Sequence, residues 1–270
     1  MLSRRAYGVL AVTFSCPPDK GIQGVWSWAD ERHACRHPVR GQRHPPPQEG
    51  DLPKGLTVVG TRPLLWHVMS HFRRHGFDDF VVLIGDGGHH IRQYFADTGE
   101  PVRLLDAGPD VNSGSRLAQL RELQLDGPFL LSYCDVLTDV DVSGLARAHR
   151  RSDSLVTVMA VHPPPRYGEL VLDGNRVVRF DEKPDRCDQW INGGIFAIEP
   201  EALEVIEGDV DWSREPMATL AAAGVVRSYR HTGFWRPLDT PKDRAELIDA
   251  WTRGELPSYE AEFGVTPAAL

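Results

Sequence analysis

The sequence is poor in cysteine. Its 270 residues include four cysteines, and no two of them form a CxxC pair. A chain with so few thiols and no metal-ligand spacing is not a disulfide scaffold, and the pattern argues against structural zinc. Low cysteine usage of this kind is typical of a reducing compartment, so we predict a cytoplasmic protein.

Long apolar runs are also lacking. None reaches the roughly 18 residues that a membrane-spanning helix needs, so we expect no membrane partner. The stretch from Ala6 to Ser15 resembles the core of a short signal peptide and precedes Cys16, which leaves an exported, lipidated sugar-binding protein as an alternative. The three residues before Cys16 suit neither signal peptidase nor a lipoprotein site, however. The stretch Tyr7 to Phe14 is also typical of a buried β-strand.

Beyond the N-terminal segment, basic residues are fewer than acidic ones. Residues 1–50 carry 7 Lys and Arg against 4 Asp and Glu, which leaves 23 against 34 for residues 51–270 and a net charge of −8. An acidic body offers no basic stripe to follow a phosphate backbone, so we expect no nucleic-acid partner. The hydrophobic content of 41% is typical of a globular protein with a sizeable core.

From Leu52 onward, apolar runs alternate with helical patterns. This alternation predicts an α/β protein whose central sheet is mainly parallel and covered by helices. The expected strands are 80–84, 102–105, 129–133, 155–161, 169–172, 177–180, 194–198 and 225–229. The expected helices are 64–76, 91–96, 117–123, 202–206, 216–223 and 241–251. The dipeptide Asp173-Gly174 predicts a hairpin between two of the strands.

Residues 14–50 do not fit this pattern. They are rich in Pro, Gly, His and Arg, and their Pro45-Pro46-Pro47 run suits neither a helix nor a central strand. A stretch this long without secondary structure argues against membership of a compact domain. We therefore divide the chain into a divergent segment 1–51, an α/β domain 52–258 and a tail 259–270.

Two acidic residues each stand in or just beyond an apolar stretch. Asp135 follows the run 129–133, and Asp239 ends the segment Phe234-Trp235-Arg236-Pro237-Leu238-Asp239. Open α/β sheets hold ligands and metals just beyond the ends of their strands. The two carboxylates therefore suggest one divalent-cation site built from distant parts of the chain.

Four short signatures follow one another in the α/β part. They are Pro53-Lys54, then Ser132-Tyr133-Cys134-Asp135, then Phe180-Asp181-Glu182-Lys183-Pro184 with Asn192-Gly193-Gly194, and then Pro237-Leu238-Asp239. In this order the chain resembles the sugar-1-phosphate nucleotidylyltransferases, and most closely the glucose-1-phosphate cytidylyltransferases. The resemblance implies a Rossmann-like nucleotide-diphospho-sugar transferase fold with a small antiparallel sugar-binding addition.

The resemblance also implies a reaction. A nucleoside monophosphate passes from a nucleoside triphosphate, expected to be CTP, to the phosphate of a hexose 1-phosphate, expected to be glucose 1-phosphate. Pyrophosphate is released, and the NDP-sugar product serves polysaccharide synthesis such as that of lipopolysaccharide O-antigen. The cofactor implied is Mg²⁺, and the family assembles into homo-oligomers.

Roles for the charged residues follow from the same resemblance. Asp135 and Asp239 match the aspartates that hold Mg²⁺, and two carboxylates suffice because magnesium keeps waters and binds substrate phosphate. Lys54 matches the lysine that contacts the triphosphate. Lys183 matches the lysine that binds the sugar phosphate.

The sugar and the base have their own matching residues. Glu182 and Asn192 match residues that bind sugar hydroxyls, and Gly193 lets the backbone approach the ring. Tyr167 and Glu169 line the same region.

A base-contacting Gly-Gly-Arg loop of the family corresponds to Ser113-Gly114-Ser115-Arg116. Gly114 and Arg116 keep the match and are expected to bind the nucleotide. Ser115 replaces the second glycine, so the chain departs from the family pattern at this position.

The family's Gly-Gly-x-Gly-Thr-Arg-Leu loop is absent. Its glycines let backbone N–H groups wrap the triphosphate, and its arginine neutralises charge at the transferring phosphorus. One explanation is a catalytically impaired relative that binds sugar phosphate or nucleotide, with the strand 7–14 in the vacant place of the sheet. The other is a misread frame before Leu52, because the codons of Arg43-His44-Pro45-Pro46, read one nucleotide later, can encode Gly-Thr-Arg-Leu.

Overall fold

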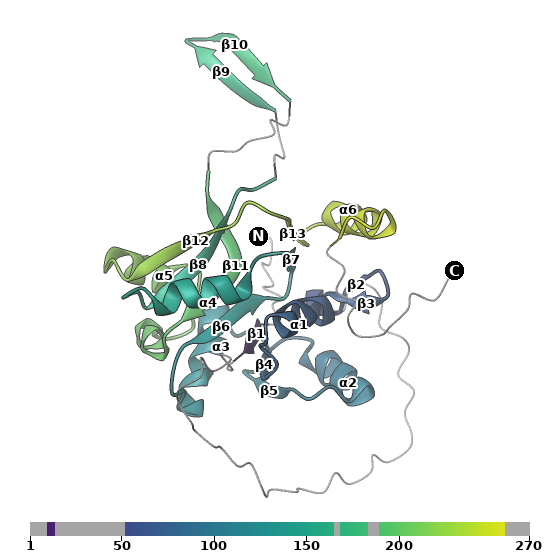
Figure 1. Cartoon of the computed structure of the whole chain (residues 1–270), viewed down its shortest axis with the longest axis vertical. Coiled ribbons are helices and arrows are strands. Elements are labelled where there is room, and N and C mark those ends of the chain that lie inside the picture. Colours follow the sequence, from purple (N-terminus) through teal and green to yellow (C-terminus); the bar gives the residue numbers. More distant parts are fainter. Residues whose placement is uncertain (1–9, 14–51, 165–167, 183–188, 257–270) are drawn as a thin grey trace, which may run out of the picture.

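A seven-stranded mixed sheet forms the centre of the structure (Figure 1). The computed structural model describes residues 10–13, 52–164, 168–182 and 189–256. In order across the sheet, the strands are β12 (Val226–Arg230), β8 (Val156–Val161), β11 (Ile191–Ile198), β6 (Phe129–Tyr133), β1 (Leu10–Thr13), β4 (Phe80–Ile84) and β5 (Arg103–Asp106). The predicted α/β class is confirmed.

The strand directions add one feature to the prediction. Only the two outer pairs, β4 with β5 and β8 with β12, run parallel, and the four inner pairs are antiparallel. The chain leaves β8 for a hairpin and returns beside it as β11, which reverses the direction. The sheet is therefore mixed: β12, β8, β6, β4 and β5 run in one direction, and β1 and β11 run against them. Hydrophobic periodicity reports burial and carries no information on direction, so it does not predict the two reversed strands.

Strand β1 fills the place between β6 and β4, as expected for the stretch Tyr7 to Phe14. Leu10 pairs with both Leu83 and Tyr133, near the ends of β4 and β6, and Thr13 pairs with residues at their starts. β4 and β6 therefore run in the same direction, with their C-terminal ends at one edge of the sheet. β1 runs against both, so Thr13 lies at the opposite edge.

Helices cover both faces of the sheet (Figure 1). They are α1 (Leu64–Arg74), α2 (Gly88–Thr98), α3 (Ser113–Ala118), α4 (Val142–Arg150), α5 (Glu215–Ala222) and α6 (Pro241–Thr252), with 3-10 helices η1 (Lys54–Leu56), η2 (Gln119–Leu123) and η3 (Pro200–Val205). Within the described ranges, no helix is both long and apolar enough to cross a membrane.

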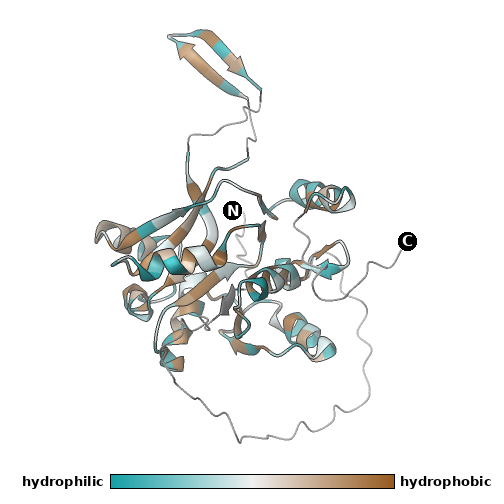
Figure 2. Cartoon of the chain, viewed as in Figure 1, coloured by the Kyte–Doolittle hydropathy of each residue, from teal (hydrophilic) through white to brown (hydrophobic). Residues whose placement is uncertain are grey.

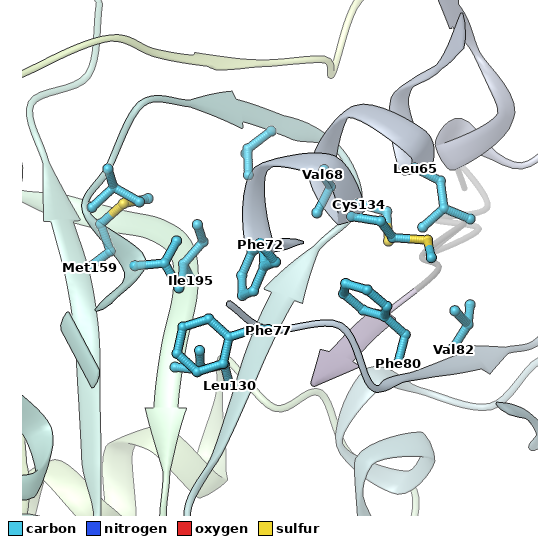
Figure 3. Packing of buried hydrophobic residues seen from close by; sticks show 14 of the residues in the cluster. Leu65, Val68, Phe72, Phe77, Phe80, Val82, Leu130, Cys134, Met159 and Ile195 are labelled. Carbon is cyan, nitrogen blue, oxygen red and sulfur yellow. The ribbon is translucent and has the colours of Figure 1, made fainter. Parts of the chain in front are cut away.

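Alternate side chains of β6 enter two separate cores. Leu130 joins the core under α1, α2 and α4, whereas Phe129 and Leu131 join the core under α3 and α5. In the first core, Leu65 and Phe72 of α1 lie among side chains of β4 and β6 (Figure 3). This alternation buries both faces of the strand and positions its C-terminal end rigidly.

Most elements lie where the sequence predicts them. β4 and β6 have the expected bounds, while α3 begins earlier, at Ser113, and passes into the 3-10 helix η2 at Gln119. Helix α4 is missing from the expected elements. Its signals are present, because Asp141 caps it by accepting a hydrogen bond from the Gly144 N–H, and buried residues recur at helical spacing.

Three two-stranded sheets complete the fold. They are β2 (Val58–Val59) with β3 (Arg62–Pro63), β7 (Val136–Thr138) with β13 (Trp235–Pro237), and β9 (Glu169–Asp173) with β10 (Arg176–Asp181). The last is the hairpin predicted from Asp173-Gly174, and Gly174 adopts the φ of +58° that a tight turn requires. It projects away from the central sheet and carries hydrophobic residues on both strands (Figures 1 and 2).

Candidate active site

The candidate active site lies at the edge of the sheet where β4 and β6 end. Asp135 follows β6 after one residue, at the turn into β7. β13 pairs antiparallel with β7, with Pro237 opposite Val136. The next residue, Leu238, donates its N–H to the carbonyl of Asp135 at 2.7 Å. This pairing brings Asp239 beside Asp135 from a distant part of the chain.

Lys54 lies between the two carboxylates. Its Nζ donates a hydrogen bond to Asp239 Oδ1 at 3.0 Å and lies 3.5 Å from Asp135 Oδ2. The lysine begins the 3-10 helix η1, in which Thr57 donates its N–H to the Lys54 carbonyl at 3.0 Å. The structure therefore assembles three predicted site residues from three separate segments.

Burial and charge shift the pKa values in this cluster. Burial raises the pKa of Asp135, the charge of Asp239 raises it further, and the Lys54 ammonium opposes both. Burial lowers the pKa of Lys54, but the charges and hydrogen bonds of the two aspartates outweigh this and leave its pKa raised. The carboxylates thus hold Lys54 in its charged form.

The two carboxylates suit a hard divalent cation. A Mg²⁺ ion prefers oxygen ligands and keeps several waters, so one or two carboxylates plus substrate phosphate complete its shell. The position between Asp135 and Asp239 already accommodates a cationic group, the Lys54 ammonium. In the part of the chain that the structure describes, no three or more His, Cys, Asp or Glu side chains cluster for a metal.

The segment expected to contact the base is tied to a second loop. Ser115 Oγ lies 2.8 Å from Asp209 Oδ1 and accepts the N–H of Val210 at 3.1 Å. Ser113 Oγ donates to Asp211 Oδ1 at 3.0 Å. Ser115, the departure from the family pattern, therefore has a structural role: its hydroxyl holds the loop 208–212 against α3.

Gly114 and Arg116 are both buried in this segment. Gly114 donates its N–H to the Val210 carbonyl at 2.9 Å, and that carbonyl leaves no room for a side chain at position 114. The Arg116 guanidinium packs over Gly85, just past the end of β4. Burial lowers the pKa of Arg116, although nearby carboxylates, Asp209 among them, oppose the shift. The segment thus lies at the same edge of the sheet as Asp135.

Comparisons with known proteins place the chain in a family. A family model described as nucleotidyl transferase matches residues 48–231. A glucose-1-phosphate cytidylyltransferase of Salmonella typhi is 32% identical over 231 residues, covering 76% of this chain and 90% of the relative.

The chain belongs to the sugar-1-phosphate nucleotidylyltransferase family. A probable glucose-1-phosphate cytidylyltransferase of Bacillus subtilis (strain 168) is 30% identical over 230 residues, covering 76% of this chain and 90% of the relative. The crystal structure of HddC from Yersinia pseudotuberculosis superposes with a TM-score of 0.61 at 17% identity, covering 75% of this chain and 91% of that one. The predicted family and Rossmann-like fold are confirmed.

A cavity of about 280 Å³ lies beside the sheet of this nucleotidylyltransferase, between β8, β11 and α5. Its walls are mostly apolar, with Phe196 and Met217 among them, and its polar side chains are Asn192 and Ser213. Asn192 is one of the predicted sugar ligands. The cavity is therefore the candidate sugar pocket.

Tyr133 links the two polar residues of the pocket. Its hydroxyl shares a hydrogen bond of 2.7 Å with Ser213 Oγ and is also hydrogen-bonded to Asn192. Burial raises the pKa of Tyr133 to about 12. Neither Ser213 nor the role of Tyr133 is predicted from the sequence. Their contact joins residues far apart in the chain, and no local motif marks it.

The backbone after Asn192 has a packing role in the structure. Gly193 is buried, a side chain there would collide with Met159, and its carbonyl accepts a hydrogen bond from Trp235 Nε1 at 2.9 Å. Gly194, with a φ of +84°, donates its N–H to Asn192 Oδ1 at 2.8 Å. The glycines thus allow close strand packing and orient the Asn192 side chain. Approach of the Gly193 backbone to a sugar ring stays a prediction.

The remaining predicted sugar ligands lie elsewhere in the nucleotidylyltransferase. Glu169 is exposed on β9 opposite Asp181, and Glu182 follows β10 and lies against Gly168. The hairpin projects away from the sheet (Figure 1), so the structure does not bring these carboxylates to the lysine–aspartate cluster. Tyr167 and Lys183 lie outside the described residues.

Proposed function

We propose that the chain joins CTP and glucose 1-phosphate to give CDP-glucose and pyrophosphate. The observation that carries the proposal is the meeting of Lys54 with Asp135 and Asp239 at the strand edge. The similarity to glucose-1-phosphate cytidylyltransferases supports the choice of base and sugar. We further propose that the NDP-sugar product serves polysaccharide assembly, such as that of lipopolysaccharide O-antigen.

The reaction is an in-line displacement at the α-phosphorus of CTP. A phosphate oxygen of glucose 1-phosphate forms the new bond to that phosphorus. The bond from the α-phosphorus to the oxygen bridging to the β-phosphorus breaks, and pyrophosphate leaves with the electron pair. Both reactants are polyanions, so the site must supply positive charge where they meet.

Side chains of the protein would supply most of the charge and the hydrogen bonds that the two substrates need. The Lys54 ammonium would bind triphosphate oxygens, and Lys183 would bind the phosphate of the sugar. Asp135 and Asp239 would hold Mg²⁺, which neutralises charge on the phosphates when bound. Asn192, oriented by Gly194 and Tyr133, would bind sugar hydroxyls in the adjacent cavity.

Pyrophosphate release tests the proposal directly. The purified chain is incubated with CTP, glucose 1-phosphate and Mg²⁺, and CDP-glucose is identified by mass spectrometry. Parallel reactions with GTP, UTP and dTTP, and with mannose 1-phosphate, test the base and the sugar. Preference for another pair would overturn the assignment of substrates and leave the reaction class intact.

A second candidate is a relative that binds the substrates without turnover. It is favoured by the absence of the Gly-Gly-x-Gly-Thr-Arg-Leu sequence and by the direction of β1, which ends at the edge opposite Asp135. Thr13, the last residue of β1, therefore lies at the edge away from the predicted triphosphate position. Calorimetric binding of CTP and glucose 1-phosphate without pyrophosphate release would identify this candidate.

We also propose a homo-oligomer that acts in the cytoplasm. The exposed apolar face of the β9–β10 hairpin supports self-association, because Leu172 and Phe180 are 59% and 63% exposed. CTP is found in the cytoplasm, so an enzyme that uses it is expected there and not outside the cell. The mass of the N-terminal peptide tests the exported alternative, since lipidation of Cys16 would shift it.

A further inference from the structure

The ammonium of Lys54 occupies the position between the two carboxylates that would hold a divalent cation. It lies 3.0 Å from an oxygen of Asp239 and 3.5 Å from an oxygen of Asp135. Lys54 and Asp135 are partly buried, with side-chain exposed fractions of 36% and 29%, and Asp239 is exposed at 50%. Two carboxylates this close to one cation repel each other when it leaves, so the pair requires a positive group.

The backbone around this cluster holds the carboxylates more rigidly than the ammonium. Leu238 N–H binds the Asp135 carbonyl at 2.7 Å, and Asp239 N–H binds Asp243 Oδ2 at 3.1 Å. Lys54 instead carries its charge at the end of a flexible four-carbon stem. When a second cation approaches, the lysine side chain is therefore the part that can move.

We propose that Lys54 is the resident counter-ion of the metal site, and that it leaves the carboxylates for the triphosphate when Mg²⁺ enters. The inference rests on the proposed function, because it takes Mg²⁺ and a triphosphate as the ligands. The ammonium and the metal ion cannot occupy one position, so they compete for Asp135 and Asp239. A triphosphate gives the displaced ammonium a new anionic partner, which makes metal and nucleotide binding cooperative.

The first test measures Mn²⁺ binding to the full chain without nucleotide, from the loss of the free-ion electron paramagnetic resonance signal. Lys54→Met removes the ammonium, and Lys54→Arg keeps a positive charge. We expect Lys54→Met to bind Mn²⁺ on the order of ten-fold more tightly than the wild type, and Lys54→Arg to bind it no more tightly. Equal affinities of the wild type and Lys54→Met would overturn the proposal.

Two further variants separate this inference from the metal assignment. Lys242→Met is the matched control, because Lys242 is exposed on α6 and pairs with Glu246 at 3.7 Å; its Mn²⁺ affinity should equal that of the wild type. Asp135→Asn should bind Mn²⁺ less tightly. If Asp135→Asn binds as well as the wild type, or no variant binds, the metal site and this inference are both wrong. If Asp135→Asn binds Mn²⁺ less tightly but Lys54→Met binds it as the wild type does, the metal site stands and only the exchange of Lys54 for the metal ion is wrong.

The second test follows the lysine itself. Acetylation of the wild-type chain by an amine-selective reagent, mapped by peptide mass spectrometry, reports how free each ammonium is. Mg²⁺ alone should raise the labelling of Lys54 relative to Lys242, and added CTP should lower it again. Labelling of Lys54 that does not respond to Mg²⁺ contradicts the exchange.

Discussion

At the scale of single residues, the side chain and the backbone of Asp135 have different roles. Its carboxylate is partly exposed at the sheet edge, while its backbone carbonyl binds Leu238 and so joins β7 to β13. A substitution that changes only the side chain leaves that backbone bond in place. Charge at this position can therefore be removed without removing the contact that assembles the site.

Asp135→Asn should lower the rate of pyrophosphate release on the order of 10³-fold or more, because it removes a proposed ligand of the Mg²⁺ ion that would neutralise phosphate charge. The midpoint of thermal unfolding should change little. Asp153→Asn is the control, since Asp153 is 89% exposed and pairs with Arg227 at 3.4 Å, on the surface. Full activity of Asp135→Asn would show that the metal assignment is wrong.

At the scale of elements, two contacts between segments can be tested by measuring the free energy of unfolding. The first joins α3 to the loop 208–212, through the Ser115 hydroxyl and Asp209. Hydrogen bonding by the Asn112 N–H, and then by Ser115, lowers the pKa of Asp209 and so favours its charged form. A serine in place of the family's glycine therefore adds a contact that glycine cannot make.

Ser115→Ala should lower the free energy of unfolding by about 1 kcal/mol, the typical net contribution of a hydrogen-bonded hydroxyl. Urea denaturation at pH 7 measures it. A double-mutant cycle with Asp209→Ala is the control, because the two effects should not add if the side chains interact. If the effects of Ser115→Ala and Asp209→Ala simply add, the loss of stability in Ser115→Ala has another cause than this contact.

The second contact is buried in α1. His71 is 6% exposed and donates its Nε2–H to the Val140 carbonyl at 2.9 Å. Burial, aided by the charge of His75, lowers the pKa of His71 from 6.5 to about 4. Because the folded pKa lies below the unfolded one, protonation favours unfolding. The stability that this histidine contributes is complete above pH 6.5 and is lost as the pH falls toward 4.

His71→Gln should therefore reduce the acid sensitivity of the fold. Between pH 7 and pH 5, we expect the variant to lose about 2 kcal/mol less unfolding free energy than the wild type. Urea denaturation at both pH values measures the difference, and the exposed His89→Gln on α2 is the control. An unchanged pH dependence in His71→Gln would mean that other groups carry it.

At the scale of the whole molecule, the β9–β10 hairpin gathers exposed hydrophobic residues that need an explanation. Six of the nine large hydrophobic residues exposed in the described chain lie on it. Leu170 pairs with Phe180 and Leu172 with Val177, so these four side chains share one face of the ribbon. An isolated hairpin is marginally stable in water, which favours a partner on that face.

The double variant Leu172→Lys with Phe180→Lys should shift the chain toward monomers, because two charges on the apolar face oppose its burial. Size-exclusion chromatography with light scattering measures the mass. Arg179→Ala is the control, since Arg179 pairs with Val171 on the other face and with Asp181 at 2.7 Å. The same mass for the double variant and the wild type would place the interface elsewhere.

The reading frame before Leu52 concerns the whole molecule as well, since it decides whether the site is complete. Sequencing the gene across codons 36–53 shows whether a single insertion or deletion restores Gly-Thr-Arg-Leu. If it does, the restored chain should release pyrophosphate on the order of 10³ to 10⁵ faster, as arginines do in phosphoryl transfer. If no such change restores the motif, the divergent segment is the native one.

The sequence predicts which residues form the candidate site better than it predicts how they contact one another. Lys54, Asp135 and Asp239 follow from motifs, because their chemistry requires those residue types at fixed points in the family's order. The contact of Tyr133 with Ser213 and the burial of Arg116 over Gly85 do not follow from motifs. Both depend on loops packing across the sheet edge, and local sequence carries no record of such contacts.

The sequence by itself determined the α/β class, the family and the residues that carry charge at the site, because periodicity and short motifs are local properties. Only the tertiary structure decided the direction of the inner strands and the place of β1. It alone brought Asp239 beside Asp135, through the pairing of β13 with β7. The physical reason is that strand pairing and loop packing depend on contacts between residues far apart in the chain, which compete for the same hydrogen-bonding edges.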